Sequence, residues 1–256
     1  MSMPFYVSPE QVMKDRADYA RKGIARGRSL VALECPAGVL IVADNPSRTL
    51  SKISEIYDRI AFAAVGKYNE FQMLRVAGVR HADMKGFSYS REDVSAKELA
   101  NAYAQTLGQV FTHEMKPYEV ELLVAEVGDP DDDHAEMYHV LYDGVVMDEQ
   151  DYSVLGGQAD QIIESLKEQY QAGMSLGDAL KHSLDDLDGF YTFVVGTEDG
   201  FGVLRDPIAC KPAVMAETDD YVAFGSEYRA LAGLPGIEKA HVWEPKPATV
   251  YFWERH

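Results

Sequence analysis

Thiol and imidazole groups are the side chains of this chain best suited to bind metals or act as nucleophiles. The sequence contains two cysteines, Cys35 and Cys210, and seven histidines. Neither cysteine has a second thiol or a histidine at the spacing of a zinc site, so we expect no bound metal and no cofactor. No histidine accompanies a nucleophile motif such as G-x-S-x-G, so a conventional catalytic triad is not expected.

An acidic run at residues 128–136 is the other segment with metal-binding chemistry. Its aspartates could offer oxygen ligands to a calcium ion. The run lacks the glycine and the closing glutamate of an EF-hand loop, and we therefore expect a solvated turn.

Composition and charge limit the partners of the chain. An apolar content of 46% with 26% charged residues is that of an ordinary soluble globular protein. The formal net charge of −18 argues against nucleic acids and anionic membranes, because both require clustered Lys and Arg. The sequence has no run of roughly 18 uncharged apolar residues and no signal peptide, and two cysteines fit a reducing compartment. We therefore expect a cytoplasmic protein.

Hydrophobic periodicity and turn residues predict a succession of helices and short strands. Ser8 followed by Pro9 is typical of a helix start, and Ser95 with Glu98 has the spacing of a capping box. Helices are expected at residues 9–27, 67–86, 95–114, 158–184 (with a break at Gly173) and 228–233, and strands at 29–35, 38–44, 61–66, 119–128, 136–144, 151–157, 189–197, 200–206, 213–218, 221–227 and 248–253.

The order of these elements predicts the fold class. Helix pairs stand between blocks of mostly antiparallel strands, which suits an α+β sandwich of two facing sheets with helices outside. No linker rich in Gly, Pro or Ser occurs near residue 185. We therefore expect residues 1–256 to form a single domain.

Four segments, residues 5–29, 42–70, 95–111 and 116–128, together resemble the α subunits of actinobacterial 20S proteasomes. They follow one another in the order of that family, and the resemblance covers residues 1–184. It implies a four-layer αββα sandwich of the Ntn-hydrolase (N-terminal nucleophile) type. It also implies a seven-membered ring of copies of this chain at the outer ends of a four-ring barrel that contains β subunits.

Ser29 is the candidate nucleophile that this fold type brings to attention. Ntn enzymes attack with the first residue of the mature chain and use its free α-amine as the base. Ser29 lies where the first strand is expected to begin, but 28 residues precede it, and its nitrogen is therefore an amide. The preceding segment has the caps of a structural helix. We expect no catalytic residue and no enzymatic activity.

The resemblance also implies a pocket for the C-terminal tail of a hexameric ATPase. Lys52 lies in a matching segment, and Gly66 and Lys67 follow at the spacing of the family's inter-subunit pocket. An ammonium group suits a chain-terminal carboxylate, and glycine permits close approach of a backbone. The alternative is that Lys52 is a surface lysine paired with Glu55.

A gate is implied at the start of the chain, because N-terminal tails close the axial pore in this family. Pro9 and Tyr19 match the family's reverse turn and open-gate contact. The archaeal Tyr-Asp-Arg gate motif is missing here. The implied gate consists of Met1, Ser2, Met3, Pro4, Phe5, Tyr6, Val7, Ser8, Pro9 and Tyr19.

Residues 185–256 depart from the α-subunit pattern and resemble the closing part of a class II glutamine amidotransferase domain. The resemblance rests on Asp188-Gly189, Arg205-Asp206-Pro207, Lys211-Pro212, and Ser226-Glu227 followed by Tyr228-Arg229-Ala230-Leu231. That family uses an N-terminal cysteine, whereas residue 2 is a serine and Cys35 is internal. Glutaminase activity is therefore not expected.

The sequence thus predicts a non-catalytic α-type subunit of the 20S proteasome core. Such a subunit forms the outer ring, gates substrate entry and docks a hexameric ATPase for protein degradation. Two alternatives remain open, namely an inactive amidotransferase-like protein and a chimeric or designed Ntn fold without activity.

Overall fold

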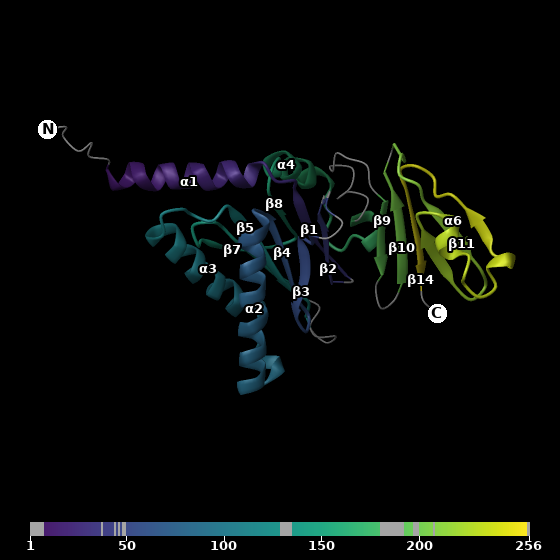
Figure 1. The fold of residues 1–256 in the computed structure, drawn as a ribbon, viewed down its shortest axis with the longest axis horizontal. Helices are drawn as coiled ribbons and strands as arrows, with labels where there is room; N and C mark the ends of the chain where they lie inside the picture. Colours follow the sequence, from purple (N-terminus) through teal and green to yellow (C-terminus); the bar gives the residue numbers. More distant parts are fainter. Residues whose placement is uncertain are drawn as a thin grey trace. The chain divides into compact units, whose positions relative to one another are not determined.

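The computed structural model describes residues 8–36, 38–43, 45, 47, 50–128, 135–179, 192–196, 200–206 and 208–254. Most of the acidic run, residues 129–134, lies outside these ranges. The chain divides into two compact units, Met1–Ser183 and Leu184–His256 (Figure 1). Within the described ranges, no helix is both long and apolar enough to cross a membrane.

The first unit combines helices with two antiparallel sheets (Figure 1). Its helices include α1 (Pro9–Ala25), α2 (Tyr68–Ser88), α3 (Ala96–His113) and α4 (Ala159–Gln169), with a 3-10 turn η1 (Arg91–Asp93). Its strands are β1 (Leu30–Cys35), β2 (Gly38–Ala43), β3 (Ile53–Tyr57), β4 (Ile60–Gly66), β5 (Val120–Glu126), β6 (Glu136–Val140), β7 (Val146–Glu149) and β8 (Tyr152–Leu155). One sheet has the order β2-β1-β8, and the other has the order β3-β4-β5-β6-β7.

Capping contacts confirm the helix starts that the sequence predicts. The Ser8 hydroxyl accepts a hydrogen bond from the amide of Gln11 at 3.3 Å, and the Ser95 hydroxyl accepts one from Glu98 at 3.4 Å. These bonds satisfy amides that have no partner inside the helix. Helix α1 ends shortly before Gly27, as expected.

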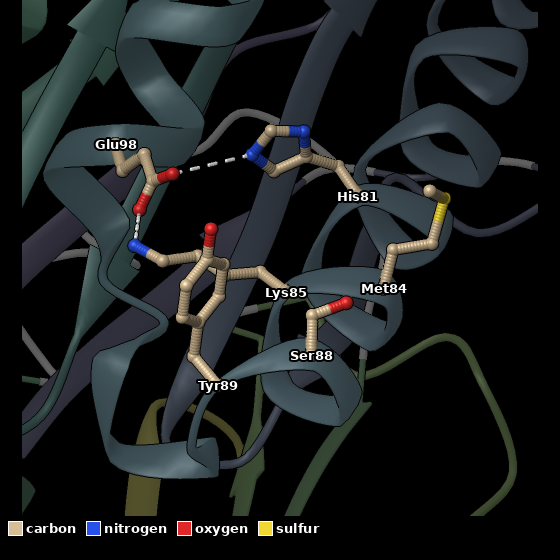
Figure 2. Close-up of a pocket in the computed structure, with 6 residues that line it drawn as sticks. All are labelled: His81, Met84, Lys85, Ser88, Tyr89 and Glu98. Atoms are coloured by element: carbon tan, nitrogen blue, oxygen red, sulfur yellow. Dashed lines mark hydrogen bonds and ion pairs between the residues drawn. The ribbon is translucent and has the colours of Figure 1, made fainter.

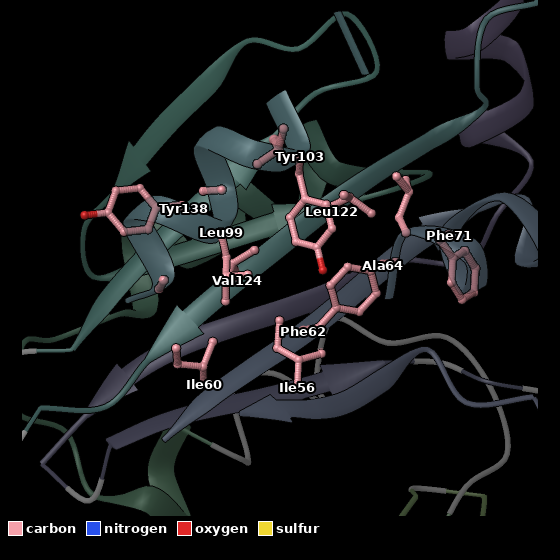
Figure 3. Packing of buried hydrophobic residues seen from close by; sticks show 14 of the residues in the cluster. Ile56, Ile60, Phe62, Ala64, Phe71, Leu99, Tyr103, Leu122, Val124 and Tyr138 are labelled. Carbon is pink, nitrogen blue, oxygen red and sulfur yellow. The ribbon is translucent and has the colours of Figure 1, made fainter. Parts of the chain in front are cut away.

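Two apolar cores use the two faces of the five-stranded sheet. On β4, Ala63 and Val65 belong to one core, whereas Phe62 and Ala64 belong to the other. Side chains alternate along a strand, so β4 is apolar on both faces. The first core also takes residues from the β2-β1-β8 sheet and from α1, including Ile24. The second lies between the five-stranded sheet and the helices α2 and α3 (Figure 3).

This mixed architecture of helices and antiparallel sheets is the one predicted. Helices α2 and α3 pack on one face of the five-stranded sheet, the three-stranded sheet shares a core with the other face, and α4 contacts β8. The complete four-layer sandwich, with residues 185–256 as part of a single domain, stays a prediction.

The second unit contains two further antiparallel sheets of three strands each. Its elements are β9 (Thr192–Gly196), β10 (Gly200–Arg205), β11 (Val214–Glu217), β12 (Val222–Gly225), α6 (Tyr228–Leu231), η2 (Ile237–Lys239), β13 (His241–Trp243) and β14 (Thr249–Glu254). The strand orders are β14-β10-β9 and β12-β11-β13. Ala216, Leu231 and Ile237 form a small buried cluster that joins β11 to the two short helices.

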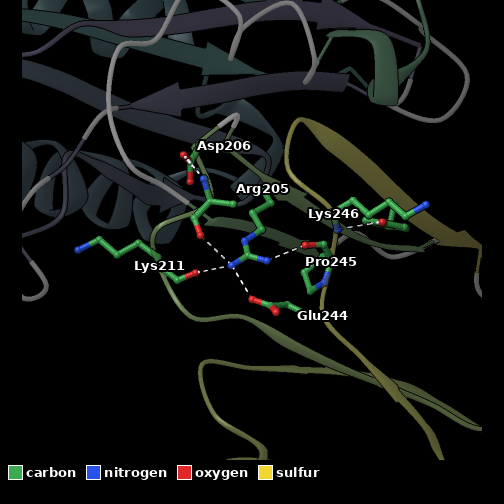
Figure 4. Close-up of polar contacts among 8 residues, drawn as sticks. Arg205, Asp206, Lys211, Glu244, Pro245 and Lys246 are labelled. Carbon is green, nitrogen blue, oxygen red and sulfur yellow. Dashed lines mark hydrogen bonds and ion pairs between the residues drawn. The ribbon is translucent and has the colours of Figure 1, made fainter.

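A buried arginine holds the turn that follows β10 (Figure 4). Arg205 Nη1 donates to the carbonyl of Pro245 at 2.7 Å. Its Nη2 donates to the carbonyls of Ala209 and Lys211 at 2.9 Å each, and to Glu244 Oε1 at 2.8 Å. Bonds from a charged donor are the strong ones, so this turn has a structural role. The resemblance of the segment to amidotransferases stays a prediction.

Three strands, β3, β7 and β13, are not among those expected from the sequence. Each is short and contains polar residues, such as Glu55 in β3 and Asp148 in β7. Each pairs with a longer or more apolar neighbour, namely β4, β6 or β11. Strand formation depends strongly on such context, and composition alone therefore did not reveal them.

Candidate functional site

The predicted docking lysine lies at the junction between α1 and β1. Lys52 immediately precedes β3, and its carbonyl accepts a hydrogen bond from the amide of Ala64 on β4 at 3.0 Å. Its ammonium group donates to the carbonyl oxygen of Arg28 at 2.9 Å. Because Arg28 lies between α1 and β1, this one side chain connects the junction to β3.

Gly66 ends β4 and lies against the same junction. Its φ of +102° is in the region that favours glycine, and a Cβ atom there would overlap the carbonyl oxygen of Glu119. A Cβ on Gly27 would in turn stand 3.5 Å from the Gly66 nitrogen. The structure therefore brings Lys52 and Gly66 together with the backbone of Gly27 and Arg28, segments that are far apart in the sequence.

Lys67 follows Gly66 and stands at the start of α2. Its amide donates to the carbonyl of Glu119 at 2.9 Å, and its ammonium nitrogen lies 3.7 Å from Glu70 Oε1. Glu70 is buried, and its Oε1 accepts from Lys116 Nζ at 2.7 Å. Its Oε2 accepts from the amide of Glu119 at 2.7 Å. Burial of the Glu70 carboxylate is thus compensated by an ammonium and an amide.

Sequence reasoning missed Glu70 and Lys116. Both are charged residues in segments that read as an ordinary helix and loop, and they are distant from one another in the chain. A buried carboxylate in the first turn of a helix has no local signal that distinguishes it from an exposed one.

Ser29 has a structural contact at the start of β1. The residue is buried, and its hydroxyl donates to the carbonyl of Gly157. That Ser29 is not a nucleophile stays a prediction. Cys35 is buried and Cys210 is exposed. Among the described residues, no group of three or more His, Cys, Asp or Glu could hold a metal ion.

Comparison with known proteins identifies the family. The family model described as Proteasome subunit matches residues 24–189. The chain belongs to the proteasome subunit family. A proteasome subunit alpha from Acidimicrobium ferrooxidans is 61% identical over 189 residues, which cover 74% of this chain and 81% of the relative. A proteasome subunit alpha from Thermobifida fusca is 62% identical over 188 residues, which cover 73% of this chain and 75% of the relative.

These relatives confirm the actinobacterial α-subunit resemblance of the N-terminal part of the chain. Alpha subunits are the non-catalytic structural subunits of the proteasome, in agreement with the prediction that this chain is not an enzyme. Membership implies assembly with other proteasome subunits. Residues 190–256 lie outside the family match, and the comparisons give no support to an amidotransferase relationship there.

The gate predicted for this proteasome subunit involves residues at and before α1. Residues 1–7, from Met1 to Val7, lie outside the described part of the chain. Ser8 caps α1, and Pro9 is its first residue. Tyr19 lies on α1 with 49% of its surface exposed, and Lys116 Nζ is 5.5 Å from its ring centroid. That distance is within the range of a cation–π contact. The gate itself stays a prediction.

A surface pocket of about 460 Å³ near the end of α2 was not expected (Figure 2). Its lining residues are His81, Met84, Lys85, Ser88, Tyr89 and Glu98. The Glu98 carboxylate pairs with the ammonium of Lys85 and lies 3.6 Å from His81 Nε2. The charged groups of the pocket therefore contact one another, and we assign no ligand to it.

His139 on β6 gives the proteasome subunit a titratable group inside the fold. Its Nδ1 lies 3.4 Å from Glu149 Oε1, and its Nε2 lies 3.6 Å from Glu121 Oε2. Burial lowers the pKa of His139, but the interactions with the two glutamate carboxylates outweigh it, so the pKa is raised above 6.5. The protonated imidazole is therefore favoured in the folded chain.

The raised pKa of His139 predicts a stability that falls as the pH rises. Its contribution is fully present below the unfolded pKa and is lost as the pH rises through the folded pKa. We expect the native chain to lose more unfolding free energy between about pH 6 and about pH 9 than a His139→Gln variant does. Urea unfolding of both proteins at the two pH values measures this difference, and equal losses would contradict the prediction.

Proposed function

We propose that this chain is an α-type subunit of a 20S proteasome core that forms the outer ring, gates substrate entry and docks a hexameric ATPase. It assembles with β subunits and with further copies of itself in a seven-membered ring. It works in the cytoplasm, has no catalytic residue and supports protein degradation by controlling access to the barrel. Its fold is the four-layer αββα sandwich of the Ntn-hydrolase type.

One observation carries the docking part of this proposal. Lys52, Gly66 and the carbonyl of Arg28 lie at a single junction, where the lysine ammonium is already bonded to a backbone oxygen at 2.9 Å. An ammonium group has three donors, so it can bind a chain-terminal carboxylate together with that carbonyl. The glycine keeps the adjacent backbone accessible to an extended peptide.

A Lys52→Ala variant is expected to weaken tail binding roughly tenfold, because it removes a charge-assisted hydrogen bond to the carboxylate. The chain is co-expressed with an actinobacterial β subunit, and native mass spectrometry verifies that capped barrels form. Fluorescence anisotropy then measures binding of a labelled peptide that carries the C-terminal sequence of a proteasomal ATPase.

Lys97→Ala supplies the matched control, since Lys97 is an exposed lysine on α3. It should bind the peptide as the native chain does, and a C-terminally amidated peptide should bind the native chain weakly. A chain that stays monomeric with β subunits, or a Lys52→Ala variant with native affinity, would refute the proposed function.

A further inference from the structure

Two lysines compete for one buried carboxylate beside the docking junction. The Glu70 side chain is only 7% exposed, and its Oε1 lies near both ammonium groups. Lys116 Nζ lies 2.7 Å from this oxygen, which is a hydrogen bond. Lys67 Nζ lies 3.7 Å from the same oxygen, beyond hydrogen-bond distance. The carboxylate is therefore hydrogen-bonded to Lys116 and forms only a longer ion pair with Lys67.

Lys116 is fixed in place by several other contacts. Its Nζ donates to the carbonyl of Pro117 at 3.0 Å and pairs with Glu119 Oε2 at 2.9 Å. It also lies above the ring of Tyr19. Burial lowers the pKa of Lys116, but its bonds to Glu70 and Glu119 outweigh this, and the pKa is raised. Lys116 consequently remains a charged partner for Glu70 at neutral pH.

Lys67 has the opposite environment. Its side chain is 49% exposed, and it directly follows Gly66 of the docking junction. A buried carboxylate without its partner is strongly destabilised and will recruit another cation within reach. The ammonium of Lys67 is such a cation, and it would need to move by only about 1 Å to form a hydrogen bond with Glu70.

We propose that Lys116 is a positioning residue that occupies Glu70 and thereby keeps the Lys67 ammonium available to the carboxylate of a docked peptide. This inference rests on the proposed docking function and deepens it. Lys52 and Lys67 then each offer an ammonium group to the terminal carboxylate, and Lys116 acts on the ligand only through Glu70.

A Lys116→Met variant tests the proposal, because methionine is unbranched and similar in volume but carries no charge. In assembled rings, affinity for the free-carboxylate ATPase peptide should fall about fivefold, the scale of a partly exposed ion pair. In the double variant Glu70→Gln/Lys116→Met, the side chain at position 70 is a neutral amide and cannot form an ion pair with Lys67. Affinity should then return to within about twofold of native, the precision of such binding comparisons.

Recovery by the second substitution separates positioning from general damage, because a purely structural role for Lys116 would leave the double variant weak. A crystal structure of Lys116→Met should also place Lys67 Nζ within hydrogen-bond distance of Glu70 Oε1. Native affinity in Lys116→Met, no recovery in the double variant, or an unmoved Lys67 would each overturn the proposal. If Lys52→Ala binds like the native chain, the docking function itself is refuted, which is a distinguishable result.

Discussion

A Gly66→Ala variant is expected to lose about 3 kcal/mol or more of unfolding free energy, which would be among the largest effects of any methyl addition in this chain. The new Cβ would overlap the carbonyl oxygen of Glu119 and stand 2.9 Å from its carbonyl carbon. Gly66 pairs with Val120 in the register between β4 and β5. The two strands would therefore have to separate beside the buried Val120.

Gly173→Ala is the matched control for this prediction. Gly173 also has a positive φ, +79°, but a Cβ there has no neighbour within 4 Å. It should lose only about 1 kcal/mol, the cost of the left-handed conformation for alanine. Denaturant unfolding followed by far-ultraviolet circular dichroism compares the two variants. Equal losses of unfolding free energy in the two variants would contradict the prediction, because they would mean that β4 and β5 accommodate the methyl group without further destabilisation.

An Arg205→Met variant is expected to lose about 3 kcal/mol of stability in the second unit. The methionine fills similar space but removes all donors from a buried site. The carbonyls of Ala209, Lys211 and Pro245 would each lose a hydrogen bond at 2.7 to 2.9 Å, and Glu244 would lose its ionic partner. A buried acceptor without a donor costs more than the bond itself contributes.

Tryptophan fluorescence reports this effect selectively. The sequence has two tryptophans, Trp243 and Trp253, and both lie in the second unit. Arg229→Met is the control, because Arg229 lies on the short helix α6 and is exposed. We expect the fluorescence transition of Arg205→Met to occur at lower denaturant than that of Arg229→Met. If the two variants unfold at the same denaturant concentration, Arg205 does not stabilise the turn after β10, and the prediction is wrong.

Elements with strong local signals could be predicted from the sequence. The starts of α1 and α3 could be predicted from Ser8 and Ser95, because a side-chain cap involves residues only three positions apart. The β1–β2 hairpin and the buried strand β4 were equally evident from short apolar runs. The strand β3 was missed, because its pairing with β4 depends on a neighbour that is not part of its own segment.

The candidate site was predicted only in part, for a related reason. Lys52, Gly66 and Lys67 were found through the family resemblance, and their convergence on Arg28 required the folded backbone. The contact between Glu70 and Lys116 joins α2 to the loop before β5, and no sequence spacing encodes it.

The two sheets of the first unit also differ in the time at which a growing chain can complete them. In the five-stranded sheet, the spatial order β3-β4-β5-β6-β7 is the order of synthesis, so each strand can add to one already made. In the other sheet, Val31 of β1 pairs with Val154 of β8, which is translated long afterwards. Contacts between such distant segments form slowly. During synthesis, the edge of β1 that pairs with β8 therefore stays unpaired until β8 has been made. The core between the two sheets can be completed only late in synthesis.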